Sequence, residues 1–517
     1  MKAKTAIALL GAALLLPAAT PRAETLRAAF DTEWTALDPH YHAFPYNLSI
    51  AMTVFEALTN TNAALAPTPS LALSWQATDP QTWTLRLRPD AKFSDGTPLT
   101  AADAIASLQR VPKVPNSPGP LTPYVRPIVA MEAPDPQTLV LHTSEPTPFL
   151  PALLANVAII PARLAAATTG QFNTGEAMIG SGPYRFLRYA RGDRLELARN
   201  DSFAGRRPDW DRVEIHVVTN AAAREAGLLA HDLDFIINPS PSSAATLAQN
   251  KAVVLHKVAS TRITYLQFHQ GPAVLADMKG TNGRNPFADA RVRRAVSLAI
   301  PREAITSRVL EGLAIPAGQM IAPGQFGFDP SIAVAPADAD AAKRLLAEAG
   351  WAEGFEVALS TPADRNLNGT QVAQAIAGAL TRIGIRTTLN AVPLEVYLSG
   401  WRKGNFSLIM HGAGPQPVAA LLVPQLAGTK DPKTAFGVSN ESFYSNPALD
   451  TLMRAAFAEI DDAKREDGLR RAARIIRDET AIVPLHHEFV LWASRPGIGF
   501  TPRMDSLTFM QDVTITR

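Results

Sequence analysis

The sequence predicts an α/β protein composed of two lobes. Three features support this prediction: short strands and loops over 25–240, a strand–helix–strand unit over 355–392, and a late strand over 481–494. Strands are read from apolar residues that recur at every second position, and helices from a period of 3.6. Long helical patterns are concentrated in the second half, and the last strand follows them. A strand-rich first part, a helical second part and a late strand together indicate two lobes.

The first 23 residues have the composition of a secretory signal peptide. Lys2 and Lys4 precede an uncharged apolar run over 6–16, and prolines and small residues follow it. A run of this length is too short to span a bilayer but suits the apolar core of a signal peptide. We expect cleavage after Ala23, with Ala19 as an alternative, and release into a Gram-negative periplasm. No cysteine is present to carry a lipid anchor.

Composition excludes several classes of function. Removal of residues 1–23 takes away three basic residues and no acidic ones, so the balance becomes 46 basic against 47 acidic residues, from 49 against 47. A near-neutral chain without a basic block gives no basis for nucleic-acid binding. The lack of cysteine excludes disulfides, thiolate metal sites and cysteine nucleophiles.

A strand, a turn and a helix start are predicted between residues 82 and 110. The segment 82–88 alternates apolar and polar residues, and Asp95 with Gly96 then forms a turn signal. Thr100 and Asp103 stand at the spacing of a capping box, with aspartate in place of the usual glutamate. Both acids therefore have structural roles, and no metal or catalytic cluster is predicted here.

The second half contains most of the predicted helices. One of them, 290–300, has an apolar face of valine and alanine, and we expect its arginines (Arg291, Arg293 and Arg294) to form a solvated face that pairs with local acids. The other helices are predicted over 341–350, over 371–384, and as a pair between 446 and 480 that separates near Asp461.

Short motifs in a fixed order give the chain a family resemblance. It resembles the extracytoplasmic solute-binding proteins of ABC importers, family 5, which include dipeptide, oligopeptide and nickel binders. The matching segments extend over nearly the whole mature chain: LDP (37–39), VFEAL (54–58), PTPSLALSW (67–75), LRPDAKFSDGTPLTAAD (87–103), GSGPYRF (180–186), PFADARVRRAVSLAIPREAI (286–305), AAKRLLAEAGW (341–351) and GALTRIGI (378–385).

The resemblance implies a specific domain organisation. The fold would be a two-lobed periplasmic binding protein of type II, in the large peptide-binding class, with an extra subdomain in lobe I. Two crossing strands, near 264–270 and 482–488, would form the hinge. The implied division is a signal peptide over 1–23, lobe I over 24–265 with its subdomain over about 43–178, lobe II over 271–480, and a return to lobe I over 481–517.

The resemblance also implies a function. The chain would be the periplasmic substrate-binding subunit of an ABC importer, a monomer without cofactor that captures a small polar solute, peptide-like or other, between its lobes. It would deliver the solute to a permease with its ATPase subunits. Two alternatives remain: a binding protein that serves a sensor, and, least favoured, a secreted hydrolase.

Motifs for catalysis and metal binding are not found. Ser181 lies in GSG rather than in G-x-S-x-G, because Ile179 stands two residues before it. His486 and His487 are neighbours in a predicted strand, so they point to opposite faces and cannot jointly chelate one ion. We therefore expect no enzymatic activity and no resident metal, although a metal chelate remains possible as the ligand.

The ligand-binding residues are expected in two regions. Peptide-binding members of the family use an acid late in lobe II to pair with the peptide ammonium, but 411–422 contains no acid, and Asp31 or Glu33 would have to compensate. The amides of Gln416 and Asn156 favour a neutral, hydrogen-bonding ligand such as a sugar derivative, an opine-like compound or a modified peptide. Aromatic residues crowd the loop 33–46. The predicted ligand-binding set is Trp34, Tyr41, Phe44, Tyr46, Asn156, Trp401, His411, Gln416 and His487.

Overall fold

The structure is a computed structural model that describes residues 24–414, 418–434 and 436–516. The predicted signal peptide, with both of its candidate cleavage sites, and Gln416 lie outside the described residues. No helix within the described ranges is long and apolar enough to cross a membrane.

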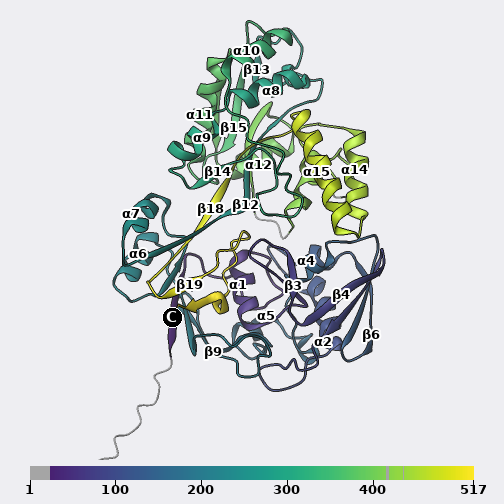
Figure 1. The fold of residues 1–517 in the computed structure, drawn as a ribbon, viewed down its shortest axis with the longest axis vertical. Coiled ribbons are helices and arrows are strands. Elements are labelled where there is room, and N and C mark those ends of the chain that lie inside the picture. Colours follow the sequence, from purple (N-terminus) through teal and green to yellow (C-terminus); the bar gives the residue numbers. More distant parts are fainter. Residues whose placement is uncertain (1–23, 415–417, 435, 517) are drawn as a thin grey trace, which may run out of the picture.

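Two long strands connect two lobes (Figure 1). β12 (Val254–Phe268) and β18 (Val483–Ser494) pair antiparallel along most of their length. In lobe I, the C-terminal end of β18 pairs with β11 (Phe235–Ile237). In lobe II, the C-terminal half of β12 pairs with β17 (Leu408–Ala413). The register shifts where the ladder passes between the lobes, next to Ala259. The predicted hinge of two crossing strands is therefore confirmed.

Lobe I is built on the strands β8–β11 and β1 of one side of this sheet. The order in the sheet is β18-β11-β1-β10-β9-β8, with β1 parallel to both of its neighbours. The elements are β1 (Thr25–Phe30), α1 (Pro45–Val54), β2 (Thr59–Thr61), β3 (Pro67–Pro69), α5 (Thr169–Asn173), β8 (Tyr184–Ala190), β9 (Arg194–Arg199), β10 (Arg212–Val217), α6 (Ala221–Leu229), α7 (Ala244–Gln249), β19 (Ile498–Phe500) and β20 (Val513–Ile515).

A subdomain extends lobe I, as predicted. Its sheet has the order β4-β5-β7-β6, with antiparallel neighbours throughout. Its elements are β4 (Ala72–Asp79), β5 (Thr82–Leu87), α2 (Ala101–Arg110), α3 (Thr122–Val125), β6 (Ile128–Asp135), β7 (Thr138–Thr143) and α4 (Leu150–Leu154).

Lobe II continues the same sheet with helices around it (Figure 1). The order there is β13-β15-β17-β12, with β16 parallel to β15 and β14 paired to β18. Its elements are β13 (Met278–Lys279), α8 (Ala290–Ala299), α9 (Arg302–Ala304), β14 (Ala314–Pro316), α10 (Ala339–Glu348), β15 (Phe355–Pro362), α11 (Gly369–Arg382), β16 (Ile385–Val392), α12 (Leu394–Arg402), α13 (Leu422–Ala427), α14 (Pro447–Ala458) and α15 (Asp462–Asp478). The domain boundaries predicted at 265–271 and 480 stay a prediction, because β12 and β18 belong to both lobes.

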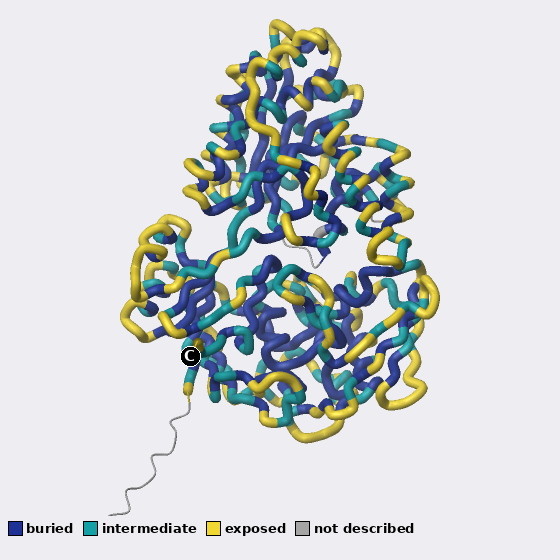
Figure 2. The backbone as a smooth tube through the Cα atoms, viewed as in Figure 1, coloured by how far each residue is buried: buried dark blue, intermediate teal, exposed yellow. Residues whose placement is uncertain are grey.

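Each lobe buries its own apolar interior. Figure 2 shows the buried segments gathered within the two bodies, with exposed segments around them. One apolar cluster fills lobe I and its subdomain, and a second surrounds the β15–β17 sheet of lobe II. A third lies around α14 and α15 and includes Phe149 and Ala152 of the subdomain, so the lobes also make apolar contact there. The ring centroids of Phe149 and Phe457 lie 5.3 Å apart across this contact.

The capping box at the start of α2 forms as predicted. Asp103 Oδ2 accepts a hydrogen bond from the backbone N–H of Thr100 at 2.8 Å. Its other oxygen accepts one from the backbone N–H of Ala162 at 2.8 Å. Asp103 therefore satisfies backbone donors in two segments and has a structural role.

The GSG segment packs against the end of α1. A Cβ added to Gly180 would lie 2.0 Å from the carbonyl oxygen of Val54, and one added to Gly182 would lie 2.6 Å from the Val54 carbonyl carbon. Ser181 between them is buried. These glycines are needed because two backbones approach closely, and not for a nucleophile turn.

The LDP segment carries a buried ion pair. Arg110 at the end of α2 donates to both oxygens of Asp38, at 2.8 and 2.7 Å. Thr169 Oγ1 also donates to Asp38, and His40 Nδ1 lies 3.1 Å from the Arg110 guanidinium. Asp38 and Arg110 are almost completely buried, so the segment that follows β1 is bound to the subdomain.

The prediction of a solvated arginine face on α8 is wrong for one residue. Arg293 is buried, and it donates to the carbonyl oxygens of Glu479 and Thr480 at 2.7 and 3.0 Å. These carbonyls follow α15, so Arg293 satisfies acceptors at the C-terminal end of that helix. Arg291 is exposed and pairs with Asp289, as expected.

Candidate functional site

Two adjoining cavities lie between the lobes. Their volumes are about 280 and 330 Å³, and they share Pro45, Arg262 and Arg365 as lining residues. Lobe I contributes the start of α1 and residues 505–508, the hinge contributes β12 and β18, and lobe II contributes Arg365 and Gly414. Side chains from both lobes and from the hinge therefore face one interlobe site.

Lobe II presents the carboxyl ends of parallel strands to this site. β15 ends at Pro362 and β17 at Ala413, and the two strands pair in parallel. Arg365 and Gly414 follow these ends in the chain. Ligands of open α/β sheets bind in the crevice at the carboxyl ends of the strands, and lobe II has this arrangement.

Two charged side chains of the hinge strands, Arg262 and Glu488, form an ion pair. Arg262 Nε on β12 lies 3.6 Å from Glu488 Oε2 on β18. Glu488 Oε1 is buried and has no hydrogen-bond partner among the described residues. Burial raises the pKa of Glu488, and the nearby Arg262 charge opposes that rise.

Arg365 is the second guanidinium group of the interlobe site. It lines both cavities, and no ion pair is found for it within the described ranges. Partial burial, and then the charge of Arg262, lower the pKa of Arg365. Two positive groups therefore face this site, and the hinge carboxylate of Glu488 lies beside one of them.

Lobe I supplies hydrogen-bonding groups to the first cavity. Tyr46 and Asn238 line it, and Asn238 Nδ2 donates to Asp31 Oδ2 at 3.0 Å. The other oxygen of Asp31 is buried without a partner in the described part of the chain. Burial, then the Asp31 charge, raise the pKa of Tyr46.

The second cavity is lined mainly by the subdomain and the C-terminal segment. Phe44, Tyr124 and Asn156 face it together with Asp505. Asp505 is already paired, because Arg503 donates to it at 2.6 and 3.1 Å. Its charge is therefore neutralised within lobe I.

Three residues of the predicted ligand-binding set line the interlobe cavities: Phe44, Tyr46 and Asn156. Tyr41 is directed elsewhere, since its hydroxyl donates to the Asn116 carbonyl at 2.9 Å. Trp34 belongs to the lobe I core and is 2% exposed.

Of the predicted residues of lobe II and the hinge, His411 and His487 are buried and Trp401 is half-buried. Trp401 stacks on His411 with ring centroids 5.1 Å apart, and His411 stacks on Tyr397 at 5.4 Å. Burial lowers the pKa of His411 to about 3 and that of His487 to about 4. The lining of the two cavities includes neither histidine, and it does not include Trp401.

The two acids named as substitutes for the missing lobe II carboxylate differ in their surroundings. Glu33 accepts hydrogen bonds from the Tyr189 hydroxyl and from the Gly192 backbone N–H, both at 2.7 Å. Asp31 lies behind Asn238 and keeps one oxygen unpaired. Only Asp31 is connected to the interlobe site through a lining residue.

Sequence reasoning missed the charged residues of the site. Arg262, Arg365 and Glu488 lie in segments whose patterns indicate only strands and a loop. Glu488 stood next to the predicted residue His487, but its side chain is on the opposite face of β18. No group of three or more His, Asp or Glu side chains able to hold a metal is found in the described ranges.

Comparisons with known proteins identify the family of the chain. The family model for bacterial extracellular solute-binding proteins, family 5, matches residues 66–432. A probable D,D-dipeptide-binding periplasmic protein of Escherichia coli K12 is 27% identical over 449 residues, which cover 84% of this chain and 83% of that protein.

Two solved structures have similar folds. HbpA2 from Haemophilus parasuis has a TM-score of 0.84 at 21% identity, covering 95% of this chain and all of that one (100%). The binding protein AgaA from A. tumefaciens R10, in complex with agropinic acid, has a TM-score of 0.70 at 24% identity, covering 95% of this chain and 99% of that one.

Proposed function

The chain belongs to the bacterial extracellular solute-binding proteins of family 5, and from this membership we propose that it is the substrate-binding subunit of an ABC importer that captures a carboxylate-bearing solute between its lobes. The proposal includes a periplasmic, monomeric protein that is released from its signal peptide, carries no lipid anchor and performs no chemistry. Its partners would be a permease and the ATPase subunits of that permease.

The charge balance of the interlobe site supports an anionic ligand. The lining contains Arg262, Arg365, Glu488 and Asp505, and Asp505 is neutralised by Arg503. Glu488 lies beside Arg262, which leaves Arg365 as the group without an acidic partner among the described residues. A guanidinium group binds a carboxylate through two parallel hydrogen bonds, so Arg365 suits this chemistry.

The ligands named for two similar proteins carry a carboxylate, the group that Arg365 would bind. One relative is described as probably binding D,D-dipeptides, and one similar structure contains agropinic acid. Both compounds are carboxylic acids. The proposal therefore replaces the neutral ligand inferred from Gln416 and Asn156, since that inference did not include the two arginines.

Capture would depend on contacts with both lobes. Arg365 comes from lobe II, whereas Tyr46 and Asn238 come from lobe I, and β12 and β18 connect them. A solute that binds both sides favours the arrangement in which both contacts are made. No bond needs to be formed or broken, and the solute is released unchanged.

The first experiment identifies the solute. Native mass spectrometry of protein purified from the periplasm of the producing cell would detect retained cargo, and isothermal titration would compare that solute with its methyl ester. We expect the ester to bind about 30-fold or more weakly, because a charge-assisted pair contributes ~2 kcal/mol or more. A neutral cargo, or an ester that binds as tightly as the free acid, would exclude the proposed ligand class.

The alternatives have separate tests. Incubation of the solute with the protein, followed by mass analysis, should return it unaltered; a cleaved product would indicate a hydrolase. A sensor role would be supported if deletion of the protein abolished a response to the solute but left its uptake unchanged.

A further inference from the structure

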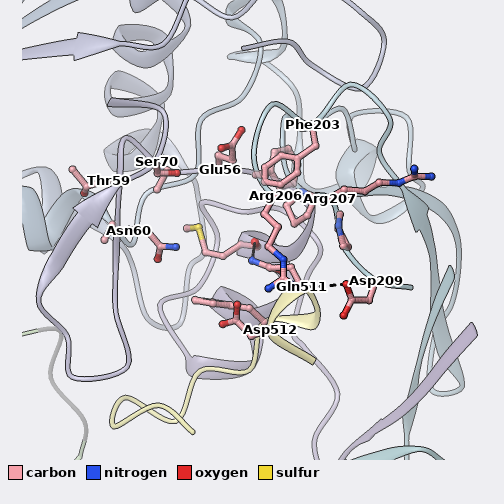
Figure 3. A pocket seen from close by; sticks show the side chains of 17 residues that line it. Glu56, Thr59, Asn60, Ser70, Phe203, Arg206, Arg207, Asp209, Gln511 and Asp512 are labelled. Carbon is pink, nitrogen blue, oxygen red and sulfur yellow. Dashed lines mark hydrogen bonds and ion pairs between the residues drawn. The ribbon is translucent and has the colours of Figure 1, made fainter. Parts of the chain in front are cut away.

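A separate cavity of about 200 Å³ lies within lobe I (Figure 3). Its lining comes from the end of α1 and β2 (52–60), from the loop 203–209, and from the C-terminal segment 509–512. The lining contains no residue of β12, β18 or lobe II. This lobe I cavity is therefore distinct from the interlobe site and does not depend on lobe closure.

Two carboxylates line the lobe I cavity without an ion pair. Glu56 is 9% exposed, and no ion pair reaches its carboxylate within the described ranges; the Ser181 hydroxyl is its hydrogen-bonding neighbour. Asp512 lines the same cavity, and its side chain has no hydrogen bond or ion pair among the described residues. Buried carboxylates are normally hydrogen-bonded or paired, so this arrangement lacks a positive group.

The two arginines that line this cavity form no ion pair with Glu56 or Asp512 among the described residues. Arg206 lies 3.4 Å from Asp209 and is 78% exposed, and Arg207 is exposed as well. The lining contains three carboxylates and two guanidinium groups, which leaves one negative charge in excess when every carboxylate is ionised. Figure 3 shows Arg206 and Asp209 on one side of the cavity, with Glu56 and Asp512 on either side of Gln511.

We propose that the lobe I cavity binds a small organic cation, of the primary ammonium class, through Glu56 and Asp512. A volume of about 200 Å³ holds roughly six or seven water molecules at ~30 Å³ each, and hence a compact ligand of similar size. Phe203 lines the cavity and offers an aromatic surface. Aromatic faces attract ammonium groups, so the wall and the carboxylates favour the same class of ligand.

The raised pKa of Glu56 is consistent with a cation site in the lobe I cavity. Burial raises the pKa of Glu56 to about 7; Ser181 and then Arg88 oppose the rise, and Asp90 adds to it. A bound ammonium group would lower this pKa, because it stabilises the charged form of the carboxylate. Cation binding near pH 7 should therefore release protons from the protein.

Burial also raises the pKa of Asp512, which has a different set of charged neighbours. Arg503 and Arg206 oppose the rise, whereas Asp505 increases it. Asp512 is therefore the second group from which a bound ammonium would release protons.

The test uses the full mature protein and two matched probes. Calorimetric titration with n-butylammonium chloride and with sodium n-butyrate compares opposite charges on one carbon chain. We expect saturable binding of the ammonium compound only, with a heat that changes between buffers of different ionisation enthalpy. The Glu56→Gln/Asp512→Asn double variant should bind about tenfold or more weakly, since hydrogen bonds to charged groups contribute most of such an affinity.

Two control variants separate this site from other effects. Glu132→Gln removes an exposed lobe I carboxylate that is not among the lining residues of the cavity, and Arg365→Gln changes a residue of the interlobe site; both should leave butylammonium binding unchanged. Equal binding of butyrate, no binding of butylammonium, or unchanged binding by the double variant would each refute the proposal. If the double variant does not fold, the absence of proton release by the unmodified protein near pH 7 would refute it instead.

Discussion

Replacement of Arg365 by glutamine tests the interlobe site most directly. The variant keeps a polar side chain but removes the guanidinium group that faces both cavities. Arg365 has no ion pair within the described part of the chain, so the substitution breaks no internal salt bridge. We therefore expect the variant to fold normally and to lose affinity for its carboxylate ligand.

The expected loss of binding free energy follows from the position of the Arg365 charge. Two unit charges about 4 Å apart interact by ~4 kcal/mol at an effective dielectric constant of about 20. The Arg365 side chain is exposed to solvent, so we reduce this value by about half, to ~2 kcal/mol. A loss of ~2 kcal/mol corresponds to roughly a 30-fold increase in Kd.

Isothermal titration with the captured solute measures the increase in Kd of the Arg365 variant. A second arginine variant of lobe II serves as the control. Arg386→Gln removes an arginine of β16 in lobe II whose pair, Glu356, lies outside the interlobe lining; its Kd should change less than about twofold. Equal affinities of the Arg365 variant and the unmodified protein would show that the ligand carboxylate is bound elsewhere or is absent.

Three further predictions concern stability. Burial, then the Arg110 charge, lower the pKa of His40 to about 4 from its ordinary 6.5; the folded state thus binds fewer protons than the unfolded state in this interval, and His40 alone should lower the free energy of unfolding by ~3 kcal/mol as the pH drops from 7 to 4. Urea titrations at both pH values measure the fall, which should be smaller in His40→Asn, and an equal slope in both proteins would contradict the assignment. Asp38→Asn leaves Arg110 buried without its carboxylate partner, so unfolding should require ~3–5 kcal/mol less; a loss below ~1 kcal/mol in chemical denaturation would argue against this buried pair. Trp34→Ala should cost ~3–5 kcal/mol of stability, because the side chain is 2% exposed in the lobe I core, and a weakened ligand affinity with unchanged stability would instead place Trp34 at the ligand.

Local patterns predicted many elements well. The helix expected over 371–384 is observed as Gly369–Arg382, and the strands on either side are Phe355–Pro362 and Ile385–Val392. The helix pair expected between 446 and 480 separates at Asp461, as predicted. Such elements can be predicted because apolar periodicity and capping residues act over a few neighbouring positions.

The interlobe site was predicted only in part. Phe44, Tyr46 and Asn156 line its cavities, but the aromatic content of a loop cannot show which side chains are used in the core. Trp34 is the example, since it belongs to the same aromatic-rich segment, 33–46, as Phe44 and Tyr46 and yet packs inside lobe I. Whether an aromatic side chain packs in the core or lines the cavity depends on the packing of segments that are distant in sequence.

The sequence alone determined the family, the two-lobed α/β fold and the hinge strands, because motif order and residue periodicity are properties of the chain itself. Only the tertiary structure brought Arg262, Arg365 and Glu488 to one cavity, and only it placed Glu56 and Asp512 in the lining of another. These residues come from segments up to several hundred positions apart. Their proximity results from strand crossing and lobe packing, which no local pattern encodes.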